Sequence, residues 1–276
     1  MKIANYKQFR EQLLWWASSF EDCVCWENAL AETVRVGVGR ERFFTDIQSV
    51  PNNEWAFGYI TYDYKNQLEN LISEHSETVC FAETAFFQPQ FVVELSKDAF
   101  TVQKGNLDEK ILFDEISKLP ICEKHSTKCS VQAKLSKEEY IAKVEALQEH
   151  IQRGDIYEVN FCQEFVAEEV ELCPADIYDS LVKASPMPFA VFLRQGNTYA
   201  FCSSPERYVK QTGDKIISQP IKGTAKRGAT LQEDTAIIKA LQNNPKERAE
   251  NVMAVDVVRN DLARVAVNGT VEVEEL

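Results

Sequence analysis

Hydrophobic and polar positions along the chain follow two periods, one helical and one alternating, and each predicts a set of elements. The first twenty residues carry charged side chains within an apolar pattern of helical spacing, which predicts an amphipathic helix. Aromatic and β-branched residues then dominate several short segments, which predict strands at 55–64, 78–87, 90–95 and 100–103. The last of these strands is expected to end at the turn Lys104-Gly105-Asn106.

The second half of the chain opens with a helix whose two ends are marked in the sequence. Ser136 and Glu139 form the capping box S-x-x-E, apolar residues recur after it at helical spacing, and Gly154 is the expected end. Alternation over residues 156–166 then predicts a strand, and a further helix is expected at about 175–183.

Two hairpins are predicted next. Turns that contain glycine connect segment 189–194 with 198–203, and segment 207–211 with 215–219. Because the strands come in hairpins and not in regular β-α-β alternation, the pattern predicts an α+β fold with antiparallel sheet.

Two helices are predicted to follow the hairpins. The first begins at a second capping box, Thr230 with Glu233, and the second begins at Asn244 and extends to about residue 265. The second helix is apolar around most of its circumference between residues 252 and 258, so we expect it to be buried.

A polar stretch that contains Pro120 lies between residues 117 and 136 and is the predicted domain junction. The 276 residues suffice for one large domain or two ordinary ones. We therefore expect an amino-terminal α+β region at 1–125 and a second domain at 126–276.

Composition and charge exclude several classes of protein. No apolar stretch approaches the ~18–20 residues of a membrane span, so no membrane interaction is expected. The 43 acidic and 30 basic residues give a formal charge of −13, which makes nucleic-acid binding unfavourable. The eight cysteines are irregularly spaced and no secretory leader is visible, as in a cytoplasmic protein with reduced thiols. Segment 206–264 is locally basic, which suits a small anionic ligand or an ordinary surface with ion pairs.

Lys222 is a candidate nucleophile. It follows a predicted strand and precedes Gly223, which permits a ligand to approach the backbone closely. A lysine that is partly desolvated loses part of its preference for the charged form, as a nucleophilic amine must. The alternative is an exposed loop lysine.

Two glutamates are the other candidates. If the second hairpin turns at Gly213, Glu206 lies opposite Pro220 and within reach of Lys222, where it would move protons or form a salt bridge. Glu250 lies in the last predicted helix, where one carboxylate with waters and substrate oxygens would suit Mg²⁺. An ion pair with Lys246, four residues earlier, is the structural alternative.

Several runs of sequence resemble the chorismate-utilising enzyme family. They are SSPERYV at 203–209, PIKGTAKRG at 220–228, and ERAENVMAVDVVRNDLARV at 247–265. GDIYEVNFCQEF at 154–165 and SPMPFAVFL at 185–193 also match in order and spacing, and GYITYDYKNQLE at 58–69 resembles the aminating members. The resemblance implies a layered α/β/β/α fold of packed antiparallel sheets.

Within this family, a lysine at position 222 resembles the members that make 4-amino-4-deoxychorismate from chorismate and ammonia for folate synthesis. Members that make anthranilate or isochorismate usually have alanine there. The resemblance implies that Lys222 attacks C2 of chorismate, that Glu206 is the general acid and base, and that Glu250 binds Mg²⁺. It also implies substrate binding by Gly223 and Thr224, and ammonia from a glutamine amidotransferase subunit.

The sequence departs from the family pattern in two places. Glu158 stands where aminating members usually have glutamine and hydroxylating members have a water-activating lysine; we expect it to contact substrate. The family also continues after the position of Leu276 with a second metal glutamate and a histidine, so we expect this sequence to span a little under two-thirds of a member. Anthranilate synthesis and a non-catalytic, truncated binding protein are the alternative functions.

Overall fold

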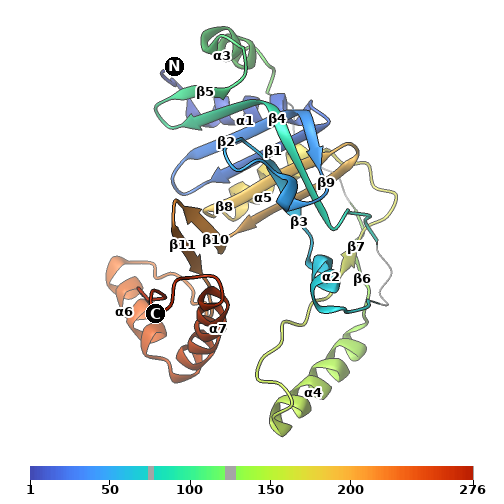
Figure 1. The fold of residues 1–276 in the computed structure, drawn as a ribbon, viewed down its shortest axis with the longest axis vertical. Coiled ribbons are helices and arrows are strands. Elements are labelled where there is room, and N and C mark those ends of the chain that lie inside the picture. The colour runs from blue at the N-terminus through green and yellow to red at the C-terminus, as the bar shows by residue number, and fades with distance from the viewer. Residues whose placement is uncertain (74–77, 122–128, 276) are drawn as a thin grey trace.

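A computed structural model of the chain describes residues 1–73, 78–121 and 129–275. Its main element is a seven-stranded antiparallel sheet in the order β3-β4-β2-β1-β8-β9, with β5 also paired to β4 (Figure 1). The strands are β1 (Asp22–Asn28), β2 (Thr33–Phe44), β3 (Phe57–Ile60), β4 (Thr84–Ser96), β5 (Phe100–Lys104), β8 (Phe189–Gln195) and β9 (Thr198–Ser204). The predicted α+β class is confirmed.

Three helices cover one face of this sheet (Figure 1). They are α1 (Tyr6–Ser18), α3 (Glu109–Ser117) and α5 (Pro174–Ala184). The amphipathic pattern of α1 buries Phe9, Leu13 and Ala17 against the sheet, where they meet side chains such as Val36 and Phe192. This helix-on-sheet layer is the hydrophobic core.

The centre of the sheet was not located by the sequence patterns. β1 pairs with β2 on one side and with β8 on the other, so Cys23, Val24 and Cys25 are all buried. A strand with both faces covered does not alternate in polarity, which removes the signal on which strand prediction relies.

The strands predicted at 78–87 and 90–95 are one strand, β4, which begins at Thr84 and continues through Pro89, so residues 78–83 are not in a strand. Proline has no N–H to donate, and the β2–β4 register shifts between Arg40 and Arg42, next to the Arg40–Pro89 pair. This irregularity in the pairing lets β4 continue through Pro89, although the proline cannot donate a backbone hydrogen bond. The strand expected at 55–64 is shorter, and the 3₁₀ turn Tyr62–Tyr64 follows it and continues into α2 (Lys65–Glu69). A second 3₁₀ turn, Ile47–Ser49, lies between β2 and β3.

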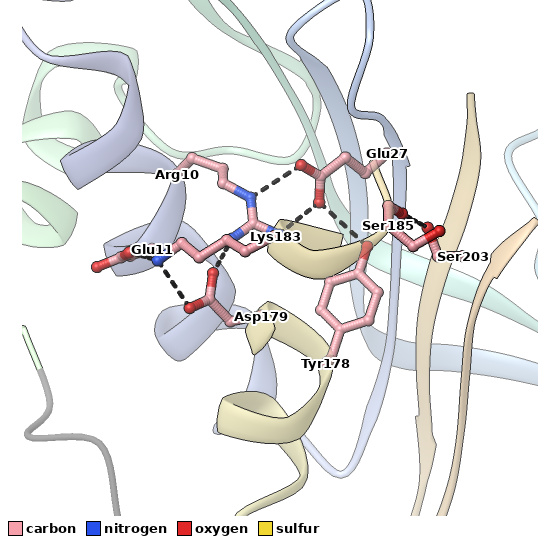
Figure 2. Close-up of polar contacts among 8 residues, drawn as sticks. All are labelled: Arg10, Glu11, Glu27, Tyr178, Asp179, Lys183, Ser185 and Ser203. Atoms are coloured by element: carbon pink, nitrogen blue, oxygen red, sulfur yellow. Dashed lines mark hydrogen bonds and ion pairs between the residues drawn. The ribbon is translucent and has the colours of Figure 1, made fainter. Parts of the chain in front are cut away.

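Buried charges connect α1, β1 and α5 (Figure 2). The Arg10 guanidinium donates from Nε and Nη2 to the two carboxylate oxygens of Glu27, at 2.9 and 2.7 Å, and from Nη1 to Asp179. The Tyr178 hydroxyl donates to Glu27 at 3.1 Å, and Lys183 contacts the other oxygen of Asp179 at 2.9 Å. Arg10, Glu27 and Asp179 are each less than one-tenth exposed, so the core contains a fully paired ionic cluster.

Helix α4 (Lys137–Arg153) forms as predicted. Ser136 and Glu139 make both capping-box hydrogen bonds, and Gly154 ends the helix with φ of 80°. The strand predicted at 156–166 is wrong except for β7 (Phe165–Val166), which pairs with β6 (Gln132–Ala133). Within the described residues, no neighbouring strand pairs with 156–164, and an alternating pattern without a partner strand cannot form a ladder.

The end of the chain consists of a separate hairpin and a helix pair, drawn from brown to red in Figure 1. β10 (Arg207–Thr212) pairs with β11 (Lys215–Gln219), and α6 (Leu231–Asn243) is followed by α7 (Pro245–Ala263). The prediction that α7 is buried is wrong: the structure buries none of its residues, and Val257 is 62% exposed. Apolar residues around a helix lead to burial only where other elements pack against it, and α7 contacts mainly α6.

The predicted division into residues 1–125 and 126–276 stays a prediction. Residues 122–128 at the expected junction lie outside the described part of the chain. In the structure, β8 and β9 from the second segment join the same sheet as β1 to β4.

Candidate functional site

Lys222 lies in the segment that connects β11 with α6. Its neighbour Gly223 has φ of 77°, a conformation that side-chain-bearing residues rarely adopt. A Cβ on Gly223 would also lie only 2.3 Å from a carboxylate oxygen of Glu247 on α7. The positive φ favours glycine here, and the short distance shows that the backbone beside Lys222 lies close to the Glu247 side chain in the first turn of α7.

The nearest partner of Lys222 is Glu158. The Lys222 ammonium donates to the Glu158 carboxylate in an ion pair between residues 64 positions apart. The side chains are 26% and 34% exposed, so water still reaches the pair. Glu158 lies in the irregular segment between α4 and β7, and the pair brings this segment to the end of β11.

The ion pair reverses an expectation from the sequence. Partial desolvation was expected to favour the neutral amine, but the pKa of Lys222 is raised above its usual value. The hydrogen bond to Glu158 is the main cause, and it outweighs the opposing effect of burial. The charges of Glu206 and Glu250 raise the pKa of Lys222 further.

Glu206 lies directly before β10, next to the first pair of the hairpin, Arg207 with Gln219. Toward the turn the register of the hairpin shifts by one residue. A carboxylate oxygen of Glu206 accepts a hydrogen bond of 3.1 Å from the backbone N–H of Ile221. The bond fixes Glu206 beside the segment that carries Lys222.

Glu250 lies on α7 and contacts Lys246 at 3.7 Å, the pair that the helical spacing allowed. Arg259 likewise donates to Asp256 at 3.1 Å on the exposed surface. In the described part of the chain, no three His, Cys, Asp or Glu side chains group closely enough to hold a metal ion. Mg²⁺ needs only one or two carboxylates when waters and substrate supply the remaining oxygens, so Glu250 fits it as a partial ligand set.

Glu247 is a further carboxylate near Lys222 that the sequence patterns did not single out. It lies three residues before Glu250, so the two carboxylates share a helix face, and Glu247 reaches Gly223. The spacing of three residues between Glu247 and Glu250 was the signal in the sequence that could have identified Glu247. Thr224 follows Gly223 on an exposed stretch of backbone, and its expected contact with substrate stays a prediction.

The structure thus defines an α+β protein with one lysine set among carboxylates from a hairpin, a helix and an irregular segment. The profile of the chorismate binding enzymes matches residues 17–276. The chain belongs to the chorismate binding enzyme family.

Curated relatives agree with this membership. The chain is 30% identical to aminodeoxychorismate synthase component 1 of Bacillus subtilis (strain 168) over 258 residues, 84% of this chain and 54% of that protein. It is 29% identical to anthranilate synthase component 1 of Cereibacter sphaeroides over 266 residues, 88% of this chain and 53% of that protein. The chain therefore spans about half the length of the curated relatives it matches.

A solved structure shows the same fold. The crystal structure of anthranilate synthase component I from Streptococcus pneumoniae TIGR4 matches with a TM-score of 0.64 and 20% identity, over 88% of this chain and 59% of that one. The fold expected from the family resemblance is confirmed. Among the described helices, none is long and apolar enough to cross a membrane.

Proposed function

We propose that this chain is a cytoplasmic synthase component that converts chorismate and ammonia to 4-amino-4-deoxychorismate and water, for p-aminobenzoate and folate synthesis. The observation that supports this proposal is the setting of Lys222, whose amine is in direct contact with Glu158 and close to Glu206. An amine next to proton-carrying groups is the arrangement that covalent catalysis by lysine requires. The aminodeoxychorismate synthase relatives support the assignment.

In the first step, the Lys222 nitrogen forms a bond to C2 of chorismate. The two ring double bonds shift and the bond between C4 and its hydroxyl breaks. Glu206, which takes up a proton from solvent before this step, supplies the proton with which the hydroxyl leaves as water. In the second step, ammonia forms a bond to C4, the double bonds shift back, and the Lys222 amine leaves C2. The new ammonium gives its surplus proton to Glu206, which restores the acid form.

The remaining residues bind and orient the substrate. Gly223 and Thr224 would present backbone and hydroxyl groups to the substrate carboxylates beside Lys222. Glu250 would hold Mg²⁺, which when bound neutralises the ring carboxylate of chorismate. Ammonia would come from a glutamine amidotransferase subunit.

Product analysis tests the proposal. The intact protein is incubated with chorismate, Mg²⁺ and an ammonium salt, and the products are separated and identified by mass. We expect 4-amino-4-deoxychorismate, and we expect Lys222→Ala to abolish both the product and a covalent adduct on the lysine. Lys226→Ala, which removes an exposed lysine of the same segment, should leave both unchanged. Adduct of undiminished amount in the Lys222→Ala variant would exclude Lys222 as the nucleophile.

Anthranilate synthesis is the second candidate, because anthranilate synthase components match over as much of the chain. The same assay separates the two, since anthranilate is fluorescent and 4-amino-4-deoxychorismate retains a non-aromatic ring. Binding of chorismate without turnover would instead indicate a non-catalytic binding protein.

A further inference from the structure

We propose that Glu158 is a positioning residue that stores the proton of Lys222: it holds the lysine as an ammonium in the resting protein and accepts its proton when substrate covers the pair. This inference rests on the proposed function. The inference goes beyond the proposed function because it assigns a role to Glu158, a carboxylate that no other step of the reaction uses.

The geometry singles out Glu158 among the acidic groups around Lys222. Glu158 contacts the ammonium directly, whereas Glu206 and Glu250 act on it only through their charge. Glu206 is also engaged with the backbone N–H of Ile221. Glu250, on α7, contacts Lys246 and affects Lys222 through its charge. Glu247, also on α7, lies against Gly223. Glu158 is therefore the proton acceptor with the shortest path.

The chemistry of the step makes such an acceptor necessary. An ammonium has no free electron pair, so Lys222 cannot form a bond to carbon until it loses a proton. Transfer within the pair converts an ammonium and a carboxylate into a neutral amine and a carboxylic acid, and the total charge of the pair does not change. After the amine leaves C2, Glu158 returns the proton and the ion pair forms again.

Substrate binding supplies the trigger. The pair is about one-quarter to one-third exposed, so water stabilises both charges in the resting protein. A ring that covers the pair removes this water, and desolvation penalises the charged form of each partner. Covering the site therefore favours the neutral pair, and the nucleophile forms only when the substrate is present.

Trace labelling measures the pair directly, without catalysis. The intact protein is labelled with a small amount of acetic anhydride at a series of pH values, and acetylation of each lysine is read by mass spectrometry. We expect the raised pKa of Lys222 to make this lysine, in the unchanged protein, reactive at higher pH than a free lysine side chain. Glu158→Gln should move the Lys222 curve to lower pH, and Glu158→Asp should retain most of the difference. If the Lys222 curve does not move in Glu158→Gln, Glu158 does not hold Lys222 in an ion pair, and the inference is refuted.

The pH dependence of adduct formation with chorismate tests the proton transfer. In the unchanged protein the proton moves within the pair, so deprotonation of Lys222 should add no pH dependence to the rate between pH 7 and 9. In Glu158→Gln the solvent must remove the proton. The rate divided by that of the unchanged protein should therefore rise about tenfold per pH unit and at pH 7.5 lie about 10³-fold below its plateau, for a lysine pKa near 10.4. In Glu158→Asp this ratio of rates should again be independent of pH, which a purely structural role would not predict.

The outcomes separate this inference from the proposed function. If the rate in Glu158→Gln relative to the unchanged protein does not change with pH, the proton transfer is refuted while the proposed function stands. Absence of any chorismate adduct in the unchanged protein refutes the proposed function and with it the transfer step. In that case the labelling curves still test whether Glu158 and Lys222 form an ion pair.

Discussion

Replacement of Arg10 by methionine tests whether the buried ionic cluster of Figure 2 stabilises the fold. Burial disfavours the charged guanidinium, but Glu27 and Asp179 outweigh this and raise the pKa of Arg10, so it is a cation at every pH of interest. Methionine keeps much of the apolar stem and removes the charge. Two carboxylates that are each about 5% exposed then lose their shared partner.

The contacts that remain determine the size of the effect. Asp179 keeps Lys183 at 2.9 Å, whereas Glu27 keeps, among the described residues, the neutral hydroxyl of Tyr178 at 3.1 Å. The main cost is therefore one uncompensated buried carboxylate, and removal of one partner of a buried pair costs about 3–5 kcal/mol. A chain of this size loses roughly 2–4 °C of melting temperature per kcal/mol, so we expect a decrease of about 6–20 °C.

Thermal and urea unfolding, followed by tryptophan fluorescence, measure the loss. Arg259→Met is the matched control, because Arg259 pairs with Asp256 on the surface and is 58% exposed; we expect a change below about 1 kcal/mol. The double variant Arg10→Met with Glu27→Leu should recover most of the stability, since no charge is left unpaired at Glu27. If Arg10→Met is as stable as Arg259→Met, the reasoning is refuted.

Three further predictions concern groups outside the candidate site. Burial raises the pKa of the Cys23 thiol to about 12, so iodoacetamide at pH 8 should alkylate exposed Cys202 and leave Cys23 unlabelled in peptide mass spectra. Arg227 holds the pKa of Asp234 at about 2, so the stability that this carboxylate contributes should be complete above pH 4 and be lost toward pH 2; Asp234→Asn should remove this part of the acid dependence of urea unfolding. Ser136→Ala removes the cap of α4 and should destabilise the helix by about 1 kcal/mol, read as faster amide hydrogen exchange in its first turns.

Each of these predictions has a result that contradicts it. Labelling of Cys23 at the rate of Cys202 would show that the thiol is accessible. An unchanged acid dependence in Asp234→Asn would show that the contact with Arg227 contributes no stability. Unchanged exchange in Ser136→Ala, with Ser185→Ala as a control outside α4, would show that the capping box does not stabilise the helix.

Local signals explain which parts of the fold the sequence predicted. The capping boxes at Ser136 and Thr230 and the turns of both hairpins depend on residues that are close in sequence, and the structure confirms all of them. Glu206 lies beside the segment of Lys222, as expected, but the shift of one residue in the β10–β11 register could not be predicted from the turn.

Contacts between distant segments were not predictable in this way. β1 is paired with β8, about 165 residues later, and its buried position leaves no alternation in DCVCWEN to mark it as a strand. The ion pair between Glu158 and Lys222 depends on an irregular segment that the alternation of 156–166 had assigned to a strand. The apolar circumference of α7 indicated burial, but burial depends on the elements packed around a helix and not on its own sequence.

The carboxylates around Lys222 affect both the protonation of this lysine and the binding of an anionic substrate. Lys222 is surrounded by Glu158, Glu206 and Glu250, with Glu247 beside Gly223, so carboxylates outnumber the lysine. Such a site stabilises the ammonium and repels a dicarboxylate, and both effects oppose the proposed reaction. A divalent cation at Glu250 would relieve the repulsion, and proton storage by Glu158 would release the amine. The acidic setting that makes Lys222 a poor nucleophile at rest is thus the reason that nucleophile formation would depend on a bound substrate.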